Sequence, residues 1–159
     1  MSSLLVRPTA PDTQGTVIDV TPESAGWQHV GFRVHKLAKG QRLEASSDDQ
    51  EVCLVLLTGR ANVSCGEHHF DDIGKRMDIF EQIPPYAVYL PDHVSYSVEA
   101  TTDLELAVCA APGQGNHSPR LIAPDNVKQS TRGQGTNVRH VHDILPETEP
   151  ADSLLVVEV

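Results

Sequence analysis

Two histidines and a glutamate near the end of the chain have residue types and a spacing that suit a metal site. They are His140, His142 and Glu147, within the segment RHVHDILPETEP (139–150). On a β-strand, residues two apart point to the same face, so the two imidazoles can chelate one ion. His93 can add a third imidazole only if its strand lies beside this one. We keep these four residues as an alternative metal set and favour a half-exposed strand that holds no metal.

The three cysteines are widely spaced and form no CxxC pair. Cys53, Cys65 and Cys109 each lie in an apolar run, so we expect buried thiols rather than a nucleophile. An odd number of reduced thiols is typical of a cytoplasmic protein, and this is the location that we expect.

Length and charge narrow the class of protein. The 159 residues suit one domain, and 39% hydrophobic with 21% charged residues is typical of a globular chain. A net charge of −10 argues against nucleic acid and against anionic membrane surfaces as partners. We find no run of about 20 apolar residues that could span a membrane. The first fifteen residues lack a basic end followed by a long apolar core, so we expect no secretory signal.

Short alternating segments predict an all-β fold. In 29–37, Val30, Phe32 and Val34 share one face, and His29, Arg33 and His35 share the other. The segment 51–57 is apolar on both faces and predicts a buried central strand. Strands separated by turns at roughly ten-residue spacing predict a sandwich or barrel over 16–159, after an N-terminal segment of residues 1–15. The remaining strands are expected at 61–65, 87–91, 94–100, 104–111, 138–144 and 153–159.

The segment from Glu51 to Ala100 resembles the central hairpins of a cupin, a β-barrel of jelly-roll type. Functional cupins carry an HxH motif, a glutamate a few residues later, and a PxGxxH motif in a later strand. Glu51 falls at the glutamate position, but 43–47 contains no histidine. Pro91 and His93 remain from the second motif, whose glycine is missing. One imidazole and one carboxylate do not make a strong metal site, so we expect this barrel to be metal-free.

Four longer segments together resemble the 5-deoxy-glucuronate isomerase family of myo-inositol catabolism. They are DIFEQIPPYAVYLP (78–91), VEATTDLELAVCAAP (98–112), TRGQGTNVRHVHDIL (131–145) and ADSLLVVEV (151–159).

The resemblance implies a bicupin, of which this chain is the N-terminal cupin. It also implies conversion of 5-deoxy-glucuronate to 2-deoxy-5-keto-gluconate, an aldose–ketose isomerisation in which a proton moves between adjacent carbons.

The same resemblance places the chemistry outside this chain. The family's divalent metal, zinc or manganese, is expected in a C-terminal cupin that begins after the position of Val159, and no metal ligand or catalytic residue is carried over. The chain alone is then expected to be inactive, with the C-terminal cupin, a deoxy-uronic acid and further copies of itself as its partners. Arg139 is the candidate for substrate binding, because a guanidinium suits a carboxylate.

Two other functions remain open at this point. The chain could be a complete small metal-dependent cupin enzyme that uses the alternative metal set. It could also be a non-catalytic cupin that binds a sugar or mediates dimerisation.

Overall fold

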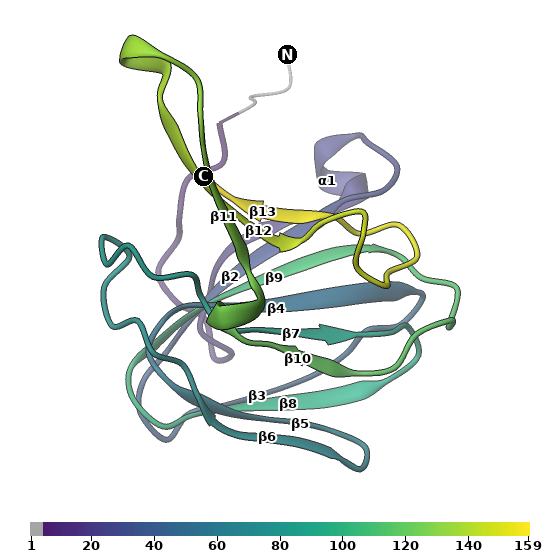
Figure 1. The fold of residues 1–159 in the computed structure, drawn as a ribbon. Coiled ribbons are helices and arrows are strands. Elements are labelled where there is room, and N and C mark those ends of the chain that lie inside the picture. Colours follow the sequence, from purple (N-terminus) through teal and green to yellow (C-terminus); the bar gives the residue numbers. More distant parts are fainter. Residues whose placement is uncertain (1–4) are drawn as a thin grey trace.

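The computed structural model describes residues 5–159, whose regular secondary structure is almost entirely β-strand (Figure 1). A short helix, α1 (Pro22–Ala25), follows the first strand, and 3-10 turns lie at Pro124–Asn126 and Gly135–Asn137. Within the described residues, no helix is long and apolar enough to cross a membrane. The strands are β1 (Thr16–Val20), β2 (Gly31–Leu37), β3 (Arg42–Ser46), β4 (Gln50–Thr58), β5 (Ala61–Cys65), β6 (His68–Ile73), β7 (Ala87–Leu90), β8 (Ser95–Ala100), β9 (Leu104–Pro112), β10 (Arg120–Ile122), β11 (Lys128–Arg132), β12 (Arg139–Leu145) and β13 (Val156–Glu158).

Two antiparallel sheets face each other in the order of a jelly roll. One sheet has the order β1-β2-β9-β4-β7-β10, and the other has the order β3-β8-β5-β6. Strands β2 to β9 alternate between the two sheets except at the β5–β6 hairpin, which lies within one sheet, and this is the order of a jelly roll. The predicted cupin-type, all-β fold is therefore confirmed. The two sheets are joined by packing and turns rather than by ladder hydrogen bonds, so the barrel is not closed.

The space between the two sheets is filled by apolar side chains. Along β4, Val52, Leu54 and Leu56 point inward and meet Val63 and Val98 of the opposite sheet. The alternation in β5 and β8 that the sequence shows is the direct consequence, because only one face of each of these strands is buried.

A third layer explains why β4 is apolar on both faces. The sheet β11-β12-β13 lies over the outer face of the six-stranded sheet (Figure 1). Outward-pointing Cys53 and Val55 of β4 pack there against Ile144, Leu145 and Val156. The prediction of a buried central strand is confirmed, and its second buried face is supplied by residues more than 80 positions later.

The prediction for 29–37 is right for the strand and wrong for part of its burial. Val34 is buried, but Val30 and Phe32 of the same predicted face are exposed. His35, from the face predicted to be polar, is buried instead, with Nδ1 3.2 Å from the carbonyl oxygen of Gln14. The segment before β1 therefore covers this end of β2. The predicted strands missed β1, β3, β6, β10 and β11, which are short or rich in charged and polar residues.

Two glycines in turns give a matched test of backbone geometry. Gly59 connects β4 to β5 with φ +92°, and a Cβ there would lie 2.1 Å from the carbonyl oxygen of Asp103. Gly66 connects β5 to β6 with φ +56° and has nothing within 4 Å of the same position. We expect Gly66→Ala to cost about 1 kcal/mol of unfolding free energy and Gly59→Ala at least about 3 kcal/mol, because only Gly59 adds a backbone clash to the conformational strain. Urea denaturation of both variants measures the difference, and equal losses would contradict it.

Candidate functional site

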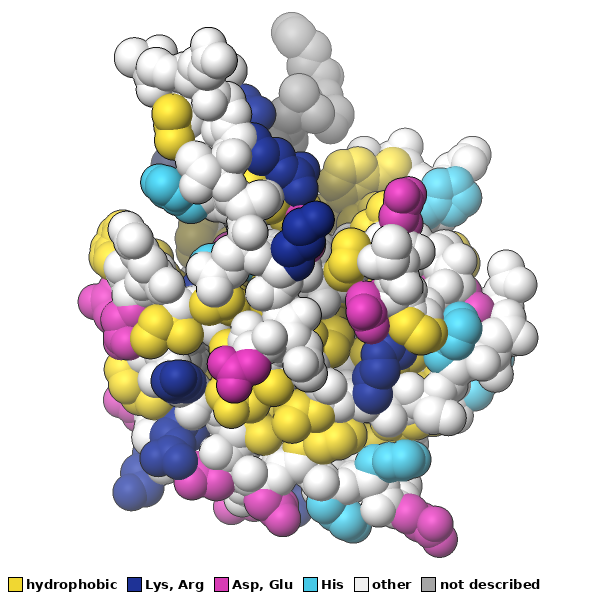
Figure 2. All heavy atoms as spheres, viewed as in Figure 1, with side chains coloured by type: hydrophobic (Ala, Val, Ile, Leu, Met, Phe, Trp, Pro, Cys, Tyr) yellow, Lys and Arg dark blue, Asp and Glu magenta, His cyan; other side chains and the backbone are white. Residues whose placement is uncertain are grey.

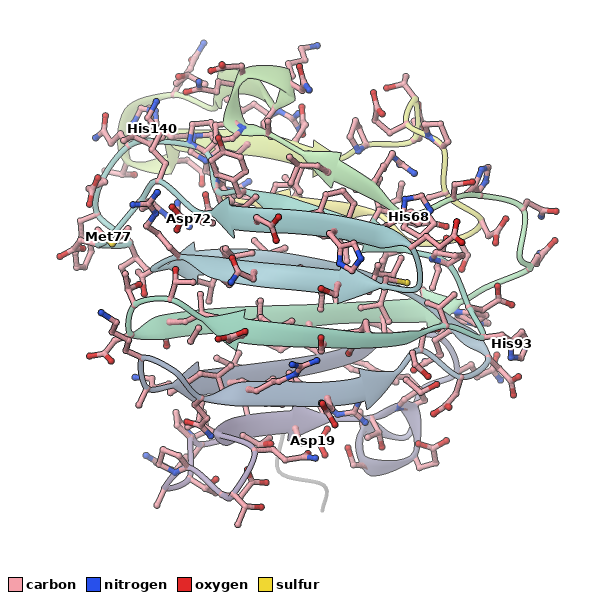
Figure 3. The ribbon with its side chains drawn as sticks, turned by 90° about the horizontal axis from the view of Figure 1, so that it is seen from below. Asp19, His68, Asp72, Met77, His93 and His140 are labelled. Carbon is pink, nitrogen blue, oxygen red and sulfur yellow. The ribbon has the colours of Figure 1, made fainter. Side chains whose placement is uncertain are left out.

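The four residues of the alternative metal set lie apart. His93 is in the loop between β7 and β8, where its imidazole faces the carboxylates of Asp49 and Asp92 at 3.5 Å each. Figure 3 shows His93 and His140 at opposite ends of the molecule. Glu147 lies on an exposed turn after β12. Among residues 5–159, no three His, Cys, Asp or Glu side chains are arranged to hold a metal ion. The alternative set is therefore not assembled.

The two histidines of β12 each use Nδ1 within the third layer. His140 Nδ1 lies 3.3 Å from Thr131 Oγ1 of the neighbouring strand β11. His142 Nδ1 lies 2.7 Å from Glu158 Oε2 of β13. His142 is thus a structural neighbour of a carboxylate that the sequence analysis did not single out.

Glu158 joins His142 to a buried arginine. Arg76, in the loop between β6 and β7, is only 3% exposed. Its Nη1 and Nη2 donate to the two carboxylate oxygens of Glu158 at 3.0 and 2.6 Å, and its Nε and Nη1 donate to the carbonyl oxygens of Leu57 and Ile83. A bidentate pair with further hydrogen bonds is the arrangement in which a guanidinium can be buried. The two partners are 82 positions apart, and no sequence pattern predicts that they pair.

The electrostatics of Glu158 follow from these contacts. Burial disfavours the ionised carboxylate and by itself raises its pKa. The hydrogen bonds from Arg76 and His142 outweigh burial, so the pKa of Glu158 is held below its ordinary value of 4.5. Glu158 therefore remains an anion that ties β13 to β12 and to the loop before β7.

A groove opens beside this network. It has a volume of about 770 Å³, and its lining includes Thr131, His140 and His142 of the third layer. The lining also includes Ile79 and Phe80, from the loop between β6 and β7, and Glu158 of β13. Met77 of this loop lies at the same end of the molecule as His140 (Figure 3).

Glu51, which falls at the cupin glutamate position, points out of the jelly roll. Its side chain is fully buried on the face of β4 that carries Cys53 and Val55. The carboxylate accepts the hydroxyl of Tyr89 at 2.6 Å and the backbone N–H groups of Asp152 and Ser153 at 2.8 and 2.6 Å. It also accepts the N–H of Leu154. A carboxylate with four donors has no lone pair directed at a metal, so Glu51 is a structural anion.

The jelly-roll interior does not fit the divalent metal that the fold implies for a functional cupin. The inward positions of β4, β7 and β9 are aliphatic, for example Leu54, Leu90 and Leu106. Tyr96 of β8 is among the inward residues, and burial raises the pKa of its phenol to about 12, which keeps it neutral. No step of a reaction is assigned to this interior.

The cysteines are placed much as expected. Cys53 and Cys65 are buried and Cys109 is partly covered, and Cys53 faces Cys109 across the pairing of β4 with β9. Burial raises the pKa of all three thiols, to about 11 for Cys109. Thiols in this state are poor nucleophiles.

Arg139 lies on a basic hairpin of an acidic protein. β11 and β12 project from the third layer, and Lys and Arg side chains gather along them (Figure 2). Lys128, Arg132 and Arg139 belong to these two strands, and Arg132 and Arg139 are directly opposed. Arg132 pairs with Asp143 at 3.2 Å, whereas exposed Arg139 donates to the side-chain oxygen of Asn137 at 3.1 Å. The remaining N–H groups of Arg139 therefore face solvent.

Comparison with known proteins identifies the relatives of this jelly roll. Residues 4–159 match the KduI/IolB family. The chain belongs to the KduI/IolB family. This finding confirms the resemblance on which the sequence analysis relied, and it covers nearly the whole chain.

The similar proteins are longer than this chain. The 5-deoxy-glucuronate isomerase of Geobacillus kaustophilus is 55% identical over 159 residues, which is 100% of this chain and 58% of that protein. The 5-deoxy-glucuronate isomerase of Halalkalibacterium halodurans is 36% identical, over 100% of this chain and 60% of that protein. The chain thus spans less than two thirds of these KduI/IolB relatives.

Solved structures agree with the fold. An IolB-like protein of Salmonella typhimurium LT2 superposes with a TM-score of 0.89 at 49% identity, covering 94% of this chain and 57% of that one. The Ylba protein of E. coli, at 11% identity and a TM-score of 0.55, shares the fold alone.

The Glu51 contacts predict a large effect of a small change. Glu51→Gln keeps the shape of the side chain but replaces one acceptor oxygen by an amide that donates toward other donors. We expect a loss of about 3 kcal/mol in the free energy of unfolding, against about 1 kcal/mol for Tyr89→Phe, which removes only one donor. Urea denaturation of the two variants measures both values, and a loss for Glu51→Gln no greater than that for Tyr89→Phe would contradict the prediction.

The lowered pKa of Glu158 predicts a pH dependence. Its stabilising contribution is complete above the unfolded-state value of about 4.5 and is lost as the pH falls through the lower folded-state value. Glu158→Gln should therefore be less stable than the unsubstituted chain at pH 7, and the difference should shrink below about pH 4. Denaturation curves of both proteins at the two pH values test this. A difference that does not change with pH would show that ionised Glu158 contributes nothing.

Proposed function

We propose that this chain is the first jelly-roll part of a cytoplasmic isomerase that converts 5-deoxy-glucuronate to 2-deoxy-5-keto-gluconate in the breakdown of myo-inositol. The observation that carries the proposal is the 55% identity, over the whole chain, to a protein named 5-deoxy-glucuronate isomerase. A relative this similar supports the same substrate more strongly than the fold does, because cupin-type folds serve many unrelated functions.

The proposal also assigns the chemical step to the part of the longer relatives that this chain does not match. The interior of this jelly roll is aliphatic, and its one carboxylate at the cupin position points outward. We therefore place the divalent metal, zinc or manganese, and the catalytic base in the part of the relatives that this chain does not match. A metal there polarises the substrate carbonyl while a base moves the proton between carbons.

Arg139 is our proposed contribution of this chain to substrate binding. The substrate is an anion, and the chain carries a net charge of −10 that repels it. The β11–β12 hairpin is a local exception, with an exposed guanidinium whose partner is a neutral amide. A bidentate contact with the uronic carboxylate suits this group.

One experiment tests the activity and the role of Arg139 together. We would build a composite protein in which this chain replaces the matching part of the G. kaustophilus relative. The isolated chain should not turn over 5-deoxy-glucuronate, and the composite protein should do so in a reaction that a chelator abolishes and zinc or manganese restores. In the composite protein, Arg139→Ala should raise KM at least about tenfold with little change in kcat, because it removes ground-state binding of the carboxylate, while Arg139→Lys should lie between.

The contrary results are distinct. Metal-dependent turnover by the isolated chain would favour a complete small cupin enzyme over the proposed division. If the composite protein folds and binds metal but is inactive, the proposal that 5-deoxy-glucuronate is the substrate is wrong. An unchanged KM for Arg139→Ala would remove Arg139 from the site and leave the rest of the proposal standing.

A further inference from the structure

The loop between β6 and β7 (residues 74–86) presents three apolar side chains to solvent. Met77 is 49% exposed, Ile79 is 53% exposed and Phe80 is 85% exposed. They lie within four residues of one loop, at the end of the molecule where Figure 3 places Met77. Single exposed apolar residues need no explanation, but a group that includes a nearly free phenylalanine is typical of an interaction surface.

Hydrogen bonds within the loop stabilise the conformation in which these three side chains are exposed. Glu81 Oε1 accepts the N–H groups of Met77 and Asp78 at 2.9 and 3.0 Å. Asp78 Oδ1 accepts the N–H of Phe80 at 2.8 Å. Both acids therefore stabilise the backbone of their own loop and hold the apolar side chains outward.

Arg76 anchors the same loop to the body of the protein. Its guanidinium reaches the carbonyl oxygen of Leu57 at 2.7 Å on one side and that of Ile83 at 3.2 Å on the other, in addition to Glu158. A surface that is fixed before it meets its partner loses little conformational entropy on binding. The loop is thus preorganised to bind.

The groove next to the loop completes the surface. Phe80 and Ile79 of the loop line it together with His140, Thr131 and Gln129 of the third layer. Arg76 and Glu158, which also line the groove, form an ion pair, so their charges offset each other. An apolar loop beside a groove whose charged lining residues are Arg76, Glu81 and Glu158, with no excess of positive charge, suits a folded protein partner better than a small anion.

We propose that Met77, Ile79 and Phe80 form the surface on which the remaining part of the relatives' chain packs. This inference rests on the proposed function, in which that part carries the metal. Two features favour it over a second copy of this chain as the occupant. Two copies with a net charge of −10 each repel one another. A part joined in the same polypeptide is present at a high effective concentration, so a modest apolar surface is sufficient to hold it.

Thiol labelling tests the surface directly. Phe80→Cys and Ile79→Cys each place one exposed thiol on it, while the native thiols are buried or have raised pKa values and should react slowly. Trp27→Cys is the matched control, because Trp27 is also exposed and lies just after α1, outside the groove. Maleimide labelling rates would be measured in the isolated chain and in the composite protein described above.

In the isolated chain, positions 27, 79 and 80 should all label rapidly. In the composite protein, positions 79 and 80 should label at least about tenfold more slowly while position 27 is unchanged, because a covered thiol reacts only when the interface opens. Rapid labelling at positions 79 and 80 in both proteins would overturn the inference. So would slow labelling in the isolated chain that becomes rapid on dilution, because the occupant would then be a second copy.

Activity of the composite protein separates this inference from the proposed function. If the composite protein is active but the thiol at position 80 still labels rapidly, the proposed packing surface is wrong and the proposed function stands. If the composite protein is inactive but the thiols at positions 79 and 80 are protected from labelling, the proposed packing surface is supported and the proposed function is wrong.

Discussion

The buried carboxylate of Glu51 is the interaction on which the arrangement of layers depends. It lies on the outer face of the central strand β4, and three consecutive N–H groups at 152–154 converge on it with the hydroxyl of Tyr89. A buried anion is stable only when donors replace the water that it has lost. Glu51 therefore fixes the segment that leads into β13 at one position on the sheet, and the third layer can pack on β4 only in that register.

An ion pair between buried Arg76 and partly buried Glu158 holds the other end of the same layer. Arg76 and Glu158 connect β13 with the loop between β6 and β7, and His142 connects Glu158 with β12. The apolar contacts of Ile144, Leu145 and Val156 with the sheet supply non-directional attraction. The carboxylates of Glu51 and Glu158 fix how the third layer is oriented on the sheet, because a carboxylate accepts hydrogen bonds only within a limited range of angles.

The buried charges of this protein are separated from the interior of the jelly roll. The inward faces hold aliphatic side chains, and the buried charges lie on the outer face, where they attach the third layer. The groove, the basic hairpin and the rigid apolar loop all lie outside the jelly roll, around the third layer.

The sequence by itself determined the all-β class, the central strand β4 and the inward faces of β5 and β8, because a period of two in apolar residues depends only on which face is buried. It also determined the family, since long matching segments persist in order along the chain. Tertiary structure alone decided that Glu51 points outward, that Arg76 meets Glu158, and that His93 lies far from His140. The buried position of His35 likewise depends on a segment that covers β2 from outside. These contacts join residues that are distant in the chain, so no local sequence pattern predicts them. Which side chains meet depends on how whole layers pack against one another.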